Sequence, residues 1–295
     1  MTLQHLIRRF PRPFRRHKFV KLLLWVRPSW RIQALRLADG TRLIADLTDA
    51  NAVTYLLREC FEPEFFVVAA PFLAKGGTFF DIGANFGFCT FGLLARTAAP
   101  LDCHLFEANR RLCYMLRQSA ELYPDRRIRV NHGAVSNCGG TSHLVVAERD
   151  LGRSFVASVG TEDVPNLVLD DYCHQHALTS IAFAKIDIEG SEPLALRGAS
   201  QLLQRGAFAA LYIEVSADAL ARQGLQPADI CSLLTGAGYR LFFCKPADLA
   251  KNCGQILELQ VHGYPVQVAE CTVDMWSGIQ QTDLLALPAT SAFLK

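Results

Sequence analysis

The sequence predicts an α/β protein whose largely parallel β-sheet is covered by helices on both faces. From residue 78 onward, apolar strand-like runs alternate with helix-like segments, which is typical of a parallel sheet. The strand-like runs, such as "TFFDIGA" and "IAFAKIDI", are apolar over most of their length, as expected for strands buried on both faces. Because the 295 residues are 51% hydrophobic and only 20% charged, the composition excludes a disordered chain.

Residues 1–38 are expected to form a basic N-terminal arm. The net charge is +2, but ten Lys and Arg precede the first acidic residue, Asp39, so the rest of the chain carries +2 less +10, or −8. Aromatic and aliphatic residues are interspersed among these cations, and Pro11 and Pro13 interrupt any single helix. We expect residues 1–36 either to contact an anionic surface such as a membrane or to fold over the acidic body. We do not expect nucleic acid as a partner.

Residues 39–74 are expected to form a hairpin and helices between the arm and the main domain. Two β-like runs in residues 34–47 flank Asp39 and Gly40, a strong hairpin signal. The next segments, "TDANAVTYLLREC" and "PEFFVVAAPFLA", predict helices, the first capped by Thr or Asp and the second starting with Pro.

Residues 75–295 are expected to form one further domain without internal repeats. We expect strands at residues 78–84, 101–108, 127–136, 181–190, 208–216 and 239–245. We expect helices from residue 88 to about 97 and at residues 110–122, 191–204 and 217–236. Residues 142–148 and 154–160 predict a hairpin inside an insertion, and a β-rich tail ends the chain.

The turn in "FFDIGANFGFCTFGLLA" lies where an open α/β sheet binds a nucleotide. Its glycines, Gly83 and Gly87, are spaced G-x-x-x-G around Asn85, unlike the G-x-G-x-x-G of dinucleotide sites. Asp81 at the strand end favours a ligand with a cationic amino acid group, and Glu107 at the next strand end suits both hydroxyls of a ribose. Together they predict S-adenosyl-L-methionine as cofactor.

The order of several motifs resembles the FkbM-type methyltransferases. The motifs are "FFDIGANFGFCTFGLLA", "FEAN", "GAVS", "LDDY", "KIDIEGSEPLALRGA" and "YIEV", which together span roughly residues 75–216. The resemblance implies a seven-stranded Rossmann-like class I methyltransferase sheet with the last strand antiparallel. It also implies methyl transfer to a hydroxyl of a sugar, glycan or secondary metabolite. Ala108 departs from the family's usual "FEP", which should alter the turn without removing the Glu107 acceptor.

Further residues are expected to line the cofactor site. Ala84 and Asn85 belong to the turn after the first strand, Ala108 follows Glu107, and Ala134 lies in "GAVS". For Ala134 we expect only a lining role. His132 would lie near the adenine, more readily as a hydrogen-bonded loop residue than as an acid or base.

The candidate catalytic residues lie in "AKIDIEGSE", to which the resemblance directs attention. On a continuous strand Lys185, Asp187 and Glu189 would point to one face, at the carboxyl end beside the cofactor crevice. Methyl transfer to a hydroxyl needs alignment and a base for the proton. We expect Asp187 or Glu189 to be that base and Lys185 to orient the acceptor; alternatively, Lys185 and Glu189 form a structural ion pair and Asp187 contacts only the cofactor. Glu214 in "YIEV" is a second candidate.

Other functions and sites remain open at this stage. A nicotinamide-dependent oxidoreductase is disfavoured by the glycine spacing, and a non-catalytic module docked through the arm would keep the same cofactor residues. We expect no metal: the scattered cysteines have no C-x-x-C pair and are expected to be reduced core residues, and "CHQH" (173–176) lacks a second ligand pair. With no apolar run long enough to span a membrane and no signal peptide, we expect a cytoplasmic protein.

Overall fold

The computed structural model describes residues 16–58, 62–148, 150–244, 256–261, 264–271 and 280–294. Residues 1–15 of the basic arm lie outside the described residues. The described helices are α2 (Arg16–Val26), α3 (Ala50–Arg58), α4 (Pro63–Leu73), α5 (Phe88–Arg96), α6 (Arg110–Ala120), α7 (Leu169–Gln175), α8 (Glu192–Arg197), α9 (Ser200–Gln204), α10 (Ala217–Arg222) and α11 (Pro227–Gly236). Short 3₁₀ turns are η1 (Pro28–Trp30), η2 (Leu151–Arg153) and η5 (Ala292–Leu294).

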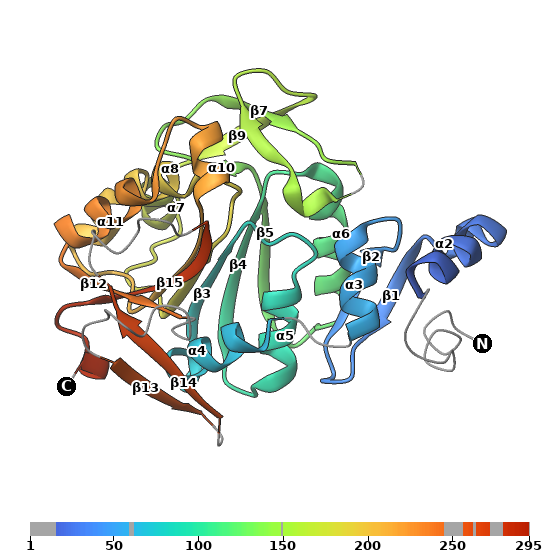
Figure 1. Cartoon of the computed structure of the whole chain (residues 1–295). Coiled ribbons are helices and arrows are strands. Elements are labelled where there is room, and N and C mark those ends of the chain that lie inside the picture. The colour runs from blue at the N-terminus through green and yellow to red at the C-terminus, as the bar shows by residue number, and fades with distance from the viewer. Residues whose placement is uncertain are drawn as a thin grey trace.

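One large sheet organises the molecule (Figure 1). Its strands are β3 (Gly77–Ile82), β4 (Leu101–Glu107), β5 (Arg127–His132), β10 (Phe183–Ile186), β11 (Leu211–Ser216), β12 (Tyr239–Phe243), β13 (Ile256–Val261), β14 (Tyr264–Glu270) and β15 (Gln281–Pro288). In the described part of the chain their order is β13-β14-β12-β15-β11-β10-β3-β4-β5. The strands β11, β10, β3, β4 and β5 run parallel to one another, and β15 is antiparallel to both β11 and β12.

The α/β class and the antiparallel last strand are confirmed, but the sheet has nine strands in the described residues rather than seven. The two additional strands form the hairpin β13–β14, which pairs with β12. Because β12 would otherwise be an edge with unpaired backbone groups, this hairpin covers it. The sequence predicted only a β-rich tail there.

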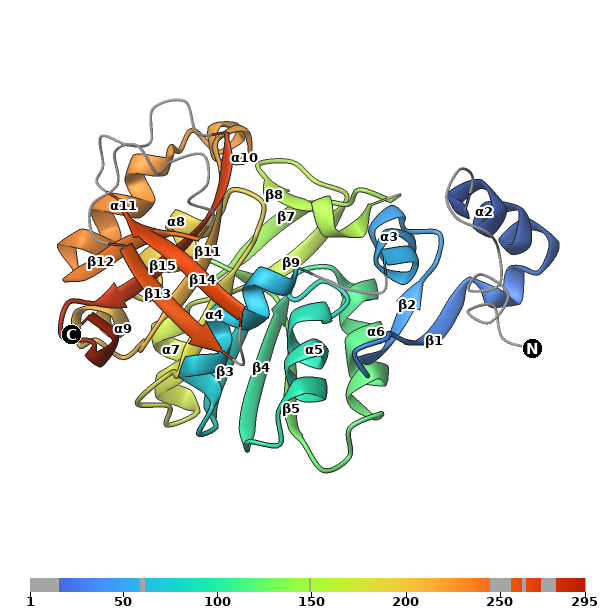
Figure 2. The ribbon, with the colours of Figure 1, turned by 60° about the horizontal axis from the view of Figure 1, so that its bottom comes forward.

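Helices cover both faces of the sheet (Figure 2). Successive strand residues point to opposite faces, so Phe79 belongs to one apolar cluster and Phe80 to the other. The first cluster joins the sheet to α4, α5 and α6, and the second joins it to α7 through α11. Both faces of the strands are therefore buried, as their apolar sequence predicts.

The segment before the large sheet contains the expected hairpin and helices. Strands β1 (Ile32–Arg36) and β2 (Arg42–Asp46) pair antiparallel around Gly40, whose φ is +91°. Asp49 begins α3, because its carboxylate accepts hydrogen bonds from the backbone N–H groups of Asn51 (2.9 Å) and Ala52 (3.0 Å). In the described residues no helix is both long and apolar enough to cross a bilayer.

The insertion forms a smaller sheet above the carboxyl ends of the main strands (Figure 1). Its strands are β6 (Ala134–Val135), β7 (Thr141–Val145), β8 (Phe155–Ala157) and β9 (Glu162–Leu167), in the order β6-β9-β7-β8. The expected hairpin is confirmed as β7 and β8, which pair antiparallel.

Two helices that the sequence predicts as continuous are broken. The helix expected at 191–204 is α8 and α9, interrupted at Gly198 and Ala199. The helix expected at 217–236 is α10 and α11, interrupted by Gly224 at φ +67° and restarted by Pro227. Glycine adopts positive φ without strain and proline favours the first helical position, so these residues end one helix and begin the next.

Candidate active site

A cavity of about 310 Å³ opens at the carboxyl ends of β3, β4, β10 and β11. From β3 the sheet continues to β4 on one side and to β10 on the other, so this is the point where the strand order reverses. Open α/β sheets bind ligands at such a point. The cavity walls come from the strand ends, from α3 and from the insertion between β7 and β8.

The turn between β3 and α5 forms the floor of the cavity. Gly83 and Gly87 both have φ of +81°, and a Cβ at Gly83 would lie 1.8 Å from the carbonyl oxygen of Asp187. Only glycine therefore allows the two loops to approach so closely. Asn85 also has a positive φ, +53°, and its Oδ1 is buried without a hydrogen-bond partner.

Glu107 connects this turn to the end of β4. One carboxylate oxygen accepts a hydrogen bond from the backbone N–H of Asn85 (2.8 Å) and the other from that of Asn109 (2.8 Å). Burial raises the pKa of Glu107 to about 7, although these N–H groups oppose the shift. Each oxygen has a second lone pair, so the side chain can still accept hydrogen bonds from a ligand in the cavity.

The predicted cofactor residues divide into two groups. Gly83, Ala84, Asn85, Glu107, Ala108 and Ala134 all line the cavity. Asp81 and Gly87 do not: Asp81 is fully buried and accepts a hydrogen bond from the Thr90 hydroxyl (2.6 Å). A Cβ at Gly87 would meet the ring of Phe91 at 2.4 Å, so Gly87 serves helix packing.

His132 stands outside the cavity lining as well. Its Nε2 lies 3.1 Å from the carbonyl oxygen of Ala108, which fits the loop role expected for it. Burial lowers the pKa of His132.

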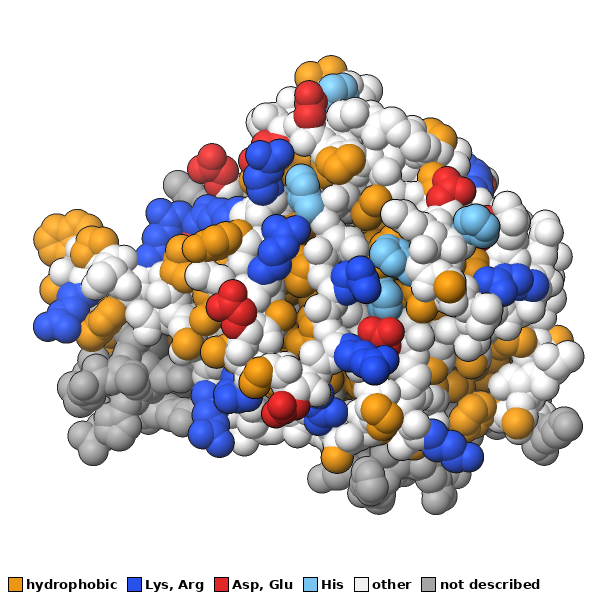
Figure 3. Space-filling model, turned by 180° about the vertical axis from the view of Figure 1, so that it is seen from behind, with side chains coloured by type: hydrophobic (Ala, Val, Ile, Leu, Met, Phe, Trp, Pro, Cys, Tyr) orange, Lys and Arg blue, Asp and Glu red, His pale blue; other side chains and the backbone are white. Residues whose placement is uncertain are grey.

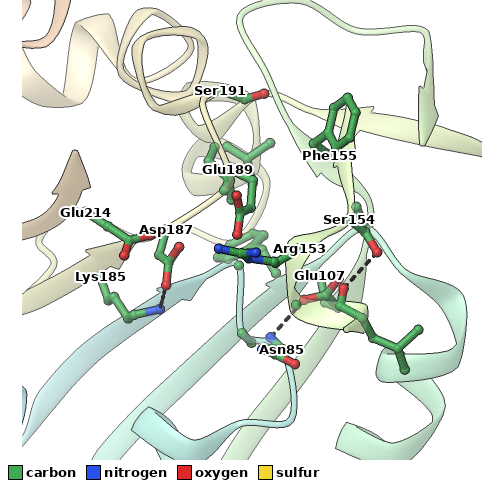
Figure 4. A pocket seen from close by; sticks show the side chains of 18 of the residues that line it. Asn85, Glu107, Arg153, Ser154, Phe155, Lys185, Asp187, Glu189, Ser191 and Glu214 are labelled. Carbon is green, nitrogen blue, oxygen red and sulfur yellow. Dashed lines mark hydrogen bonds and ion pairs between the residues drawn. The ribbon is translucent and has the colours of Figure 1, made fainter. Parts of the chain in front are cut away.

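A cluster of charged groups lies at the opposite end of the cavity. The Lys185 ammonium contacts a carboxylate oxygen of Asp187 at 2.7 Å, and Lys185 also lies in register with Asp81 on the neighbouring strand β3. Burial alone would lower the pKa of Lys185, but the adjacent carboxylates, Asp187 foremost, hold it well above its usual range. Figure 4 shows Lys185, Asp187 and Glu214 side by side, with Glu107 and Asn85 across the cavity.

Asp187 and Glu214 differ strongly in their affinity for a proton. Burial would raise the pKa of Asp187, but Lys185 and a hydrogen bond with Glu214 hold it below its usual value. The charge of Asp187, together with burial, raises the pKa of Glu214 to about 10. At neutral pH the pair therefore holds one proton, bound mainly by Glu214.

The expectation that Lys185, Asp187 and Glu189 alternate along one strand is wrong beyond Lys185, because both carboxylates lie after the strand end. Strand β10 ends at Ile186, and Glu189 has a left-handed φ of +54° before Gly190 at +105°. The side chain of Glu189 consequently contacts Arg222 (3.4 Å) rather than Lys185. Glu189 still lines the cavity, and burial, reinforced by Asp187, raises its pKa.

Glu192 holds the loop that carries these carboxylates, a role that the sequence did not predict. One of its oxygens accepts hydrogen bonds from the backbone N–H groups of Ile188 (2.9 Å) and Gly190 (3.2 Å). Burial raises the pKa of Glu192 to about 7. The last residue of the motif "EGSE", Glu192, thus fixes the conformation of the loop to which the motif belongs.

Several cavity residues come from segments without a recognisable motif. Asn51 and Tyr55 of α3 and Arg153 and Phe155 of the insertion line the cavity. In Figure 4 the guanidinium of Arg153 lies near Glu189, toward the middle of the cavity. No spacing in "LGRSF" could have predicted this placement, because it depends on how the insertion folds back.

The residues present fit S-adenosylmethionine. The carboxylate of Glu107 suits two ribose hydroxyls, and apolar groups of Phe106, Ala134 and Val135 beside it suit a flat base. The unpartnered oxygen of Asn85 suits a cationic ammonium group. In contrast, no cluster of three or more His, Cys, Asp or Glu among the described residues could hold a metal ion.

Of the cysteines that the structure describes, all except Cys138 are buried. The expected core location is confirmed for the buried cysteines and is wrong at Cys138, while their reduced state stays a prediction. Cys89 lines the cavity, and burial raises its pKa well above the usual value, so its thiol is a weak nucleophile.

Comparison with known proteins identifies a family. The model of the FkbM methyltransferase domain matches residues 81–241. No protein with curated function matches the chain. Among solved structures, the chain is similar to a methyltransferase FkbM from Methylobacillus flagellatus KT, with 17% identity and a TM-score of 0.43 over 96% of this chain and 57% of that one. It is also similar to a precorrin-6y C5,15-methyltransferase from Geobacter metallireducens GS-15, with 11% identity and a TM-score of 0.39 over 78% of this chain and 89% of that one.

The chain thus spans less than two thirds of the FkbM structure that it resembles. The family match itself begins at Asp81 in the β3 strand and ends at Leu241 in β12, and so includes the whole β3–α5 turn, Glu107 and the Lys185–Asp187–Glu214 cluster. Because this match covers more than half of the 295 residues, the protein belongs to the FkbM methyltransferase domain family.

Proposed function

We propose that this methyltransferase uses S-adenosylmethionine to methylate a hydroxyl oxygen of a sugar, a glycan or a related secondary metabolite. One observation carries the proposal. A single cavity has the Glu107 carboxylate at one end and the ionised Asp187, paired with Lys185, at the other. The first group suits a nucleoside, and the second suits the removal of a hydroxyl proton.

The cofactor would be held by the β3–α5 turn and Glu107. Glycine at position 83 lets the Asp187 loop pack directly against this turn, and Glu107 is fixed by two backbone N–H groups before any ligand enters. Such preorganisation lowers the entropic cost of binding. When bound, S-adenosylmethionine supplies an electrophilic methyl group on a cationic sulfur.

Asp187 is the preferred base. Its pKa is held low by Lys185, so it is ionised at neutral pH and available to accept the proton of an acceptor hydroxyl. Because an aliphatic hydroxyl is a far weaker acid than a carboxylic acid, the proton moves to Asp187 only as the oxygen becomes bonded to carbon. Lys185, only 5% exposed, fixes the carboxylate and limits its rotation.

Glu189 is the second candidate for the base. It lines the same cavity, but its carboxylate is engaged by Arg222 at 3.4 Å. The geometry therefore favours Asp187 over Glu189.

Cofactor binding is tested by calorimetric titration of the purified protein with S-adenosylmethionine, in parallel with Glu107→Ala. Loss of the hydrogen bonds to a charged acceptor should weaken binding by about tenfold to 150-fold. Glu121→Gln, an exposed glutamate just after α6, is the matched control. If the folded wild-type protein does not bind the cofactor, or binds NAD instead, the proposal is wrong.

The base is tested with Asp187→Asn and Glu189→Gln in a radiolabelled methyl-transfer screen of glycans and hydroxylated metabolites. We expect Asp187→Asn to lower kcat by about 100-fold to 10,000-fold with cofactor affinity retained. Asp171→Asn, on the exposed side of α7, is the control. Normal turnover by both variants would refute the base assignment, and binding without transfer to any hydroxyl acceptor would favour a non-catalytic module.

A further inference from the structure

Helix α2 presents an exposed face that combines apolar and basic side chains. Lys18, Lys21, Leu22 and Trp25 follow the spacing i, i+3, i+4, i+7 and therefore share one side of the helix. All are exposed, with Trp25 at 80% and Leu22 at 55%. The opposite side of the helix packs inward, where Val20 is fully buried.

Two other exposed apolar residues follow shortly after in the sequence. Val26 at the end of α2 is 60% exposed and Ile32 at the start of β1 is 46% exposed. We call Lys18, Lys21, Leu22, Trp25, Val26 and Ile32 the α2 patch. In Figure 3 this part of the molecule is at the left, where hydrophobic and basic side chains lie together.

Within the described part of the chain, no ion pair offsets the positive charge of the patch. No residue that the structure describes forms an ion pair with Lys18 or Lys21, and no acidic residue occurs in the sequence before Asp39. By sequence the preceding segment adds more cations, Arg8, Arg9, Arg12 and Arg15. Exposed Trp and Leu with flanking Lys are typical of helices that lie in a membrane interface.

We propose that the α2 patch binds the surface of an anionic lipid bilayer, with α2 lying in the plane of the interface. A bilayer satisfies both parts of the patch, because lipid head groups attract the lysines and acyl chains receive Leu22, Trp25 and Val26. Nucleic acid would attract the cations and leave the aliphatic side chains in water. A second copy of the chain would bring two basic arms together, which like-charge repulsion opposes.

The position of α2 gives this docking a consequence for the active site. Helix α2 packs against α3, and α3 contributes Asn51 and Tyr55 to the cavity wall. A bilayer at the α2 patch therefore lies on the α3 side of the cavity. The proposal itself is independent of methyl transfer, so its test and that of the proposed function can fail separately.

The test is flotation of the full-length protein with phosphatidylcholine vesicles that contain or lack phosphatidylserine. Each lysine near an anionic surface contributes about fivefold to binding, so Lys18→Gln with Lys21→Gln should lower the partition coefficient by about 25-fold. Trp25→Ala should lower it by about tenfold or more, because a large apolar side chain no longer enters the interface. Added salt should weaken wild-type binding.

Matched controls lie far from the patch in the sequence. Lys75→Gln with Arg127→Gln removes the same charge from exposed positions, and Tyr114→Ala removes an aromatic side chain that is 59% exposed. These variants should float like the wild type. Equal binding to vesicles with and without phosphatidylserine, or α2-patch variants that bind like the controls, would overturn the proposal. Binding to duplex RNA or DNA without binding to vesicles would show instead that the cations serve nucleic acid.

Discussion

Replacing Glu214 by Gln should make the protein more stable, and increasingly so as the pH rises. Gln has the same shape as a protonated Glu, so its carbonyl can still accept the hydrogen bond from Gln281 (2.6 Å) and its amide can donate to Asp187. The variant keeps these contacts but cannot ionise. The comparison therefore isolates the proton of Glu214.

The direction in which stability changes with pH follows from the raised pKa of Glu214. The pKa of Glu214 is about 10 in the folded protein, against a usual value of 4.5. Between these values the folded state holds a proton that the unfolded state lacks, so the stability of the wild type falls as pH rises. One proton corresponds to about 1.4 kcal/mol per pH unit.

Over two pH units the wild type loses at most about 2.7 kcal/mol of unfolding free energy through this proton. Because Glu214 is partly exposed and shares its proton with Asp187, we expect about 2 kcal/mol. The free energy of unfolding of Glu214→Gln relative to the wild type should rise by this amount between about pH 6 and about pH 8.

Chemical denaturation followed by circular dichroism measures this difference, with Glu121→Gln as the exposed control. Titrating groups that do not contact residue 214 contribute equally to the wild type and the variant, so they cancel in the comparison. Parallel curves of stability against pH for the wild type and Glu214→Gln would refute the reasoning, because Glu214 would then titrate as an ordinary carboxyl group.

Three further outcomes are expected. Gly83→Ala should destabilise the protein by about 3 kcal/mol or more, measured by thermal unfolding. The new Cβ would lie 1.8 Å from the Asp187 carbonyl oxygen, and the backbone there is left-handed. An unchanged melting temperature would contradict the turn geometry. Affinity for S-adenosylmethionine should increase as pH rises through about 7, where Glu107 ionises, and Glu107→Gln should abolish this dependence in calorimetry. Methyl transfer should survive EDTA, and loss of activity restored by one divalent metal would contradict a metal-free site.

The repeating pattern of strands and helices could be predicted because each strand is apolar enough to be buried on both faces. Helix breaks within 191–204 and 217–236 were missed, since Gly198 and Gly224 each look tolerable inside a helix when read locally. The β13–β14 hairpin was missed as part of the sheet because its pairing partner, β12, is distant in the sequence from β14. Pairing between separate segments depends on tertiary contacts that local patterns do not contain.

The candidate site was predictable where a residue's role depends on its place at a strand end. Glu107 and Gly83 lie in the cavity for this reason. Glu189 was misplaced because the strand ends three residues before it, where a left-handed turn replaces the alternation. Arg153 and Phe155 could not be predicted, since a loop reaches the cavity only through the fold of the insertion. Whether the predicted residues bind the cofactor stays a prediction.

The contact between Gly152 and Asn85 bears on how this enzyme could have diversified. A Cβ at residue 152 would lie 2.3 Å from the side-chain amide nitrogen of Asn85, so the insertion touches the β3–α5 turn there and a larger residue would require the Asn85 side chain to move. Elsewhere the insertion can exchange side chains, such as Phe155, without disturbing that turn. Substitutions in the rest of the insertion could therefore change one wall of the cavity while the turn kept its shape, provided that residue 152 stayed glycine.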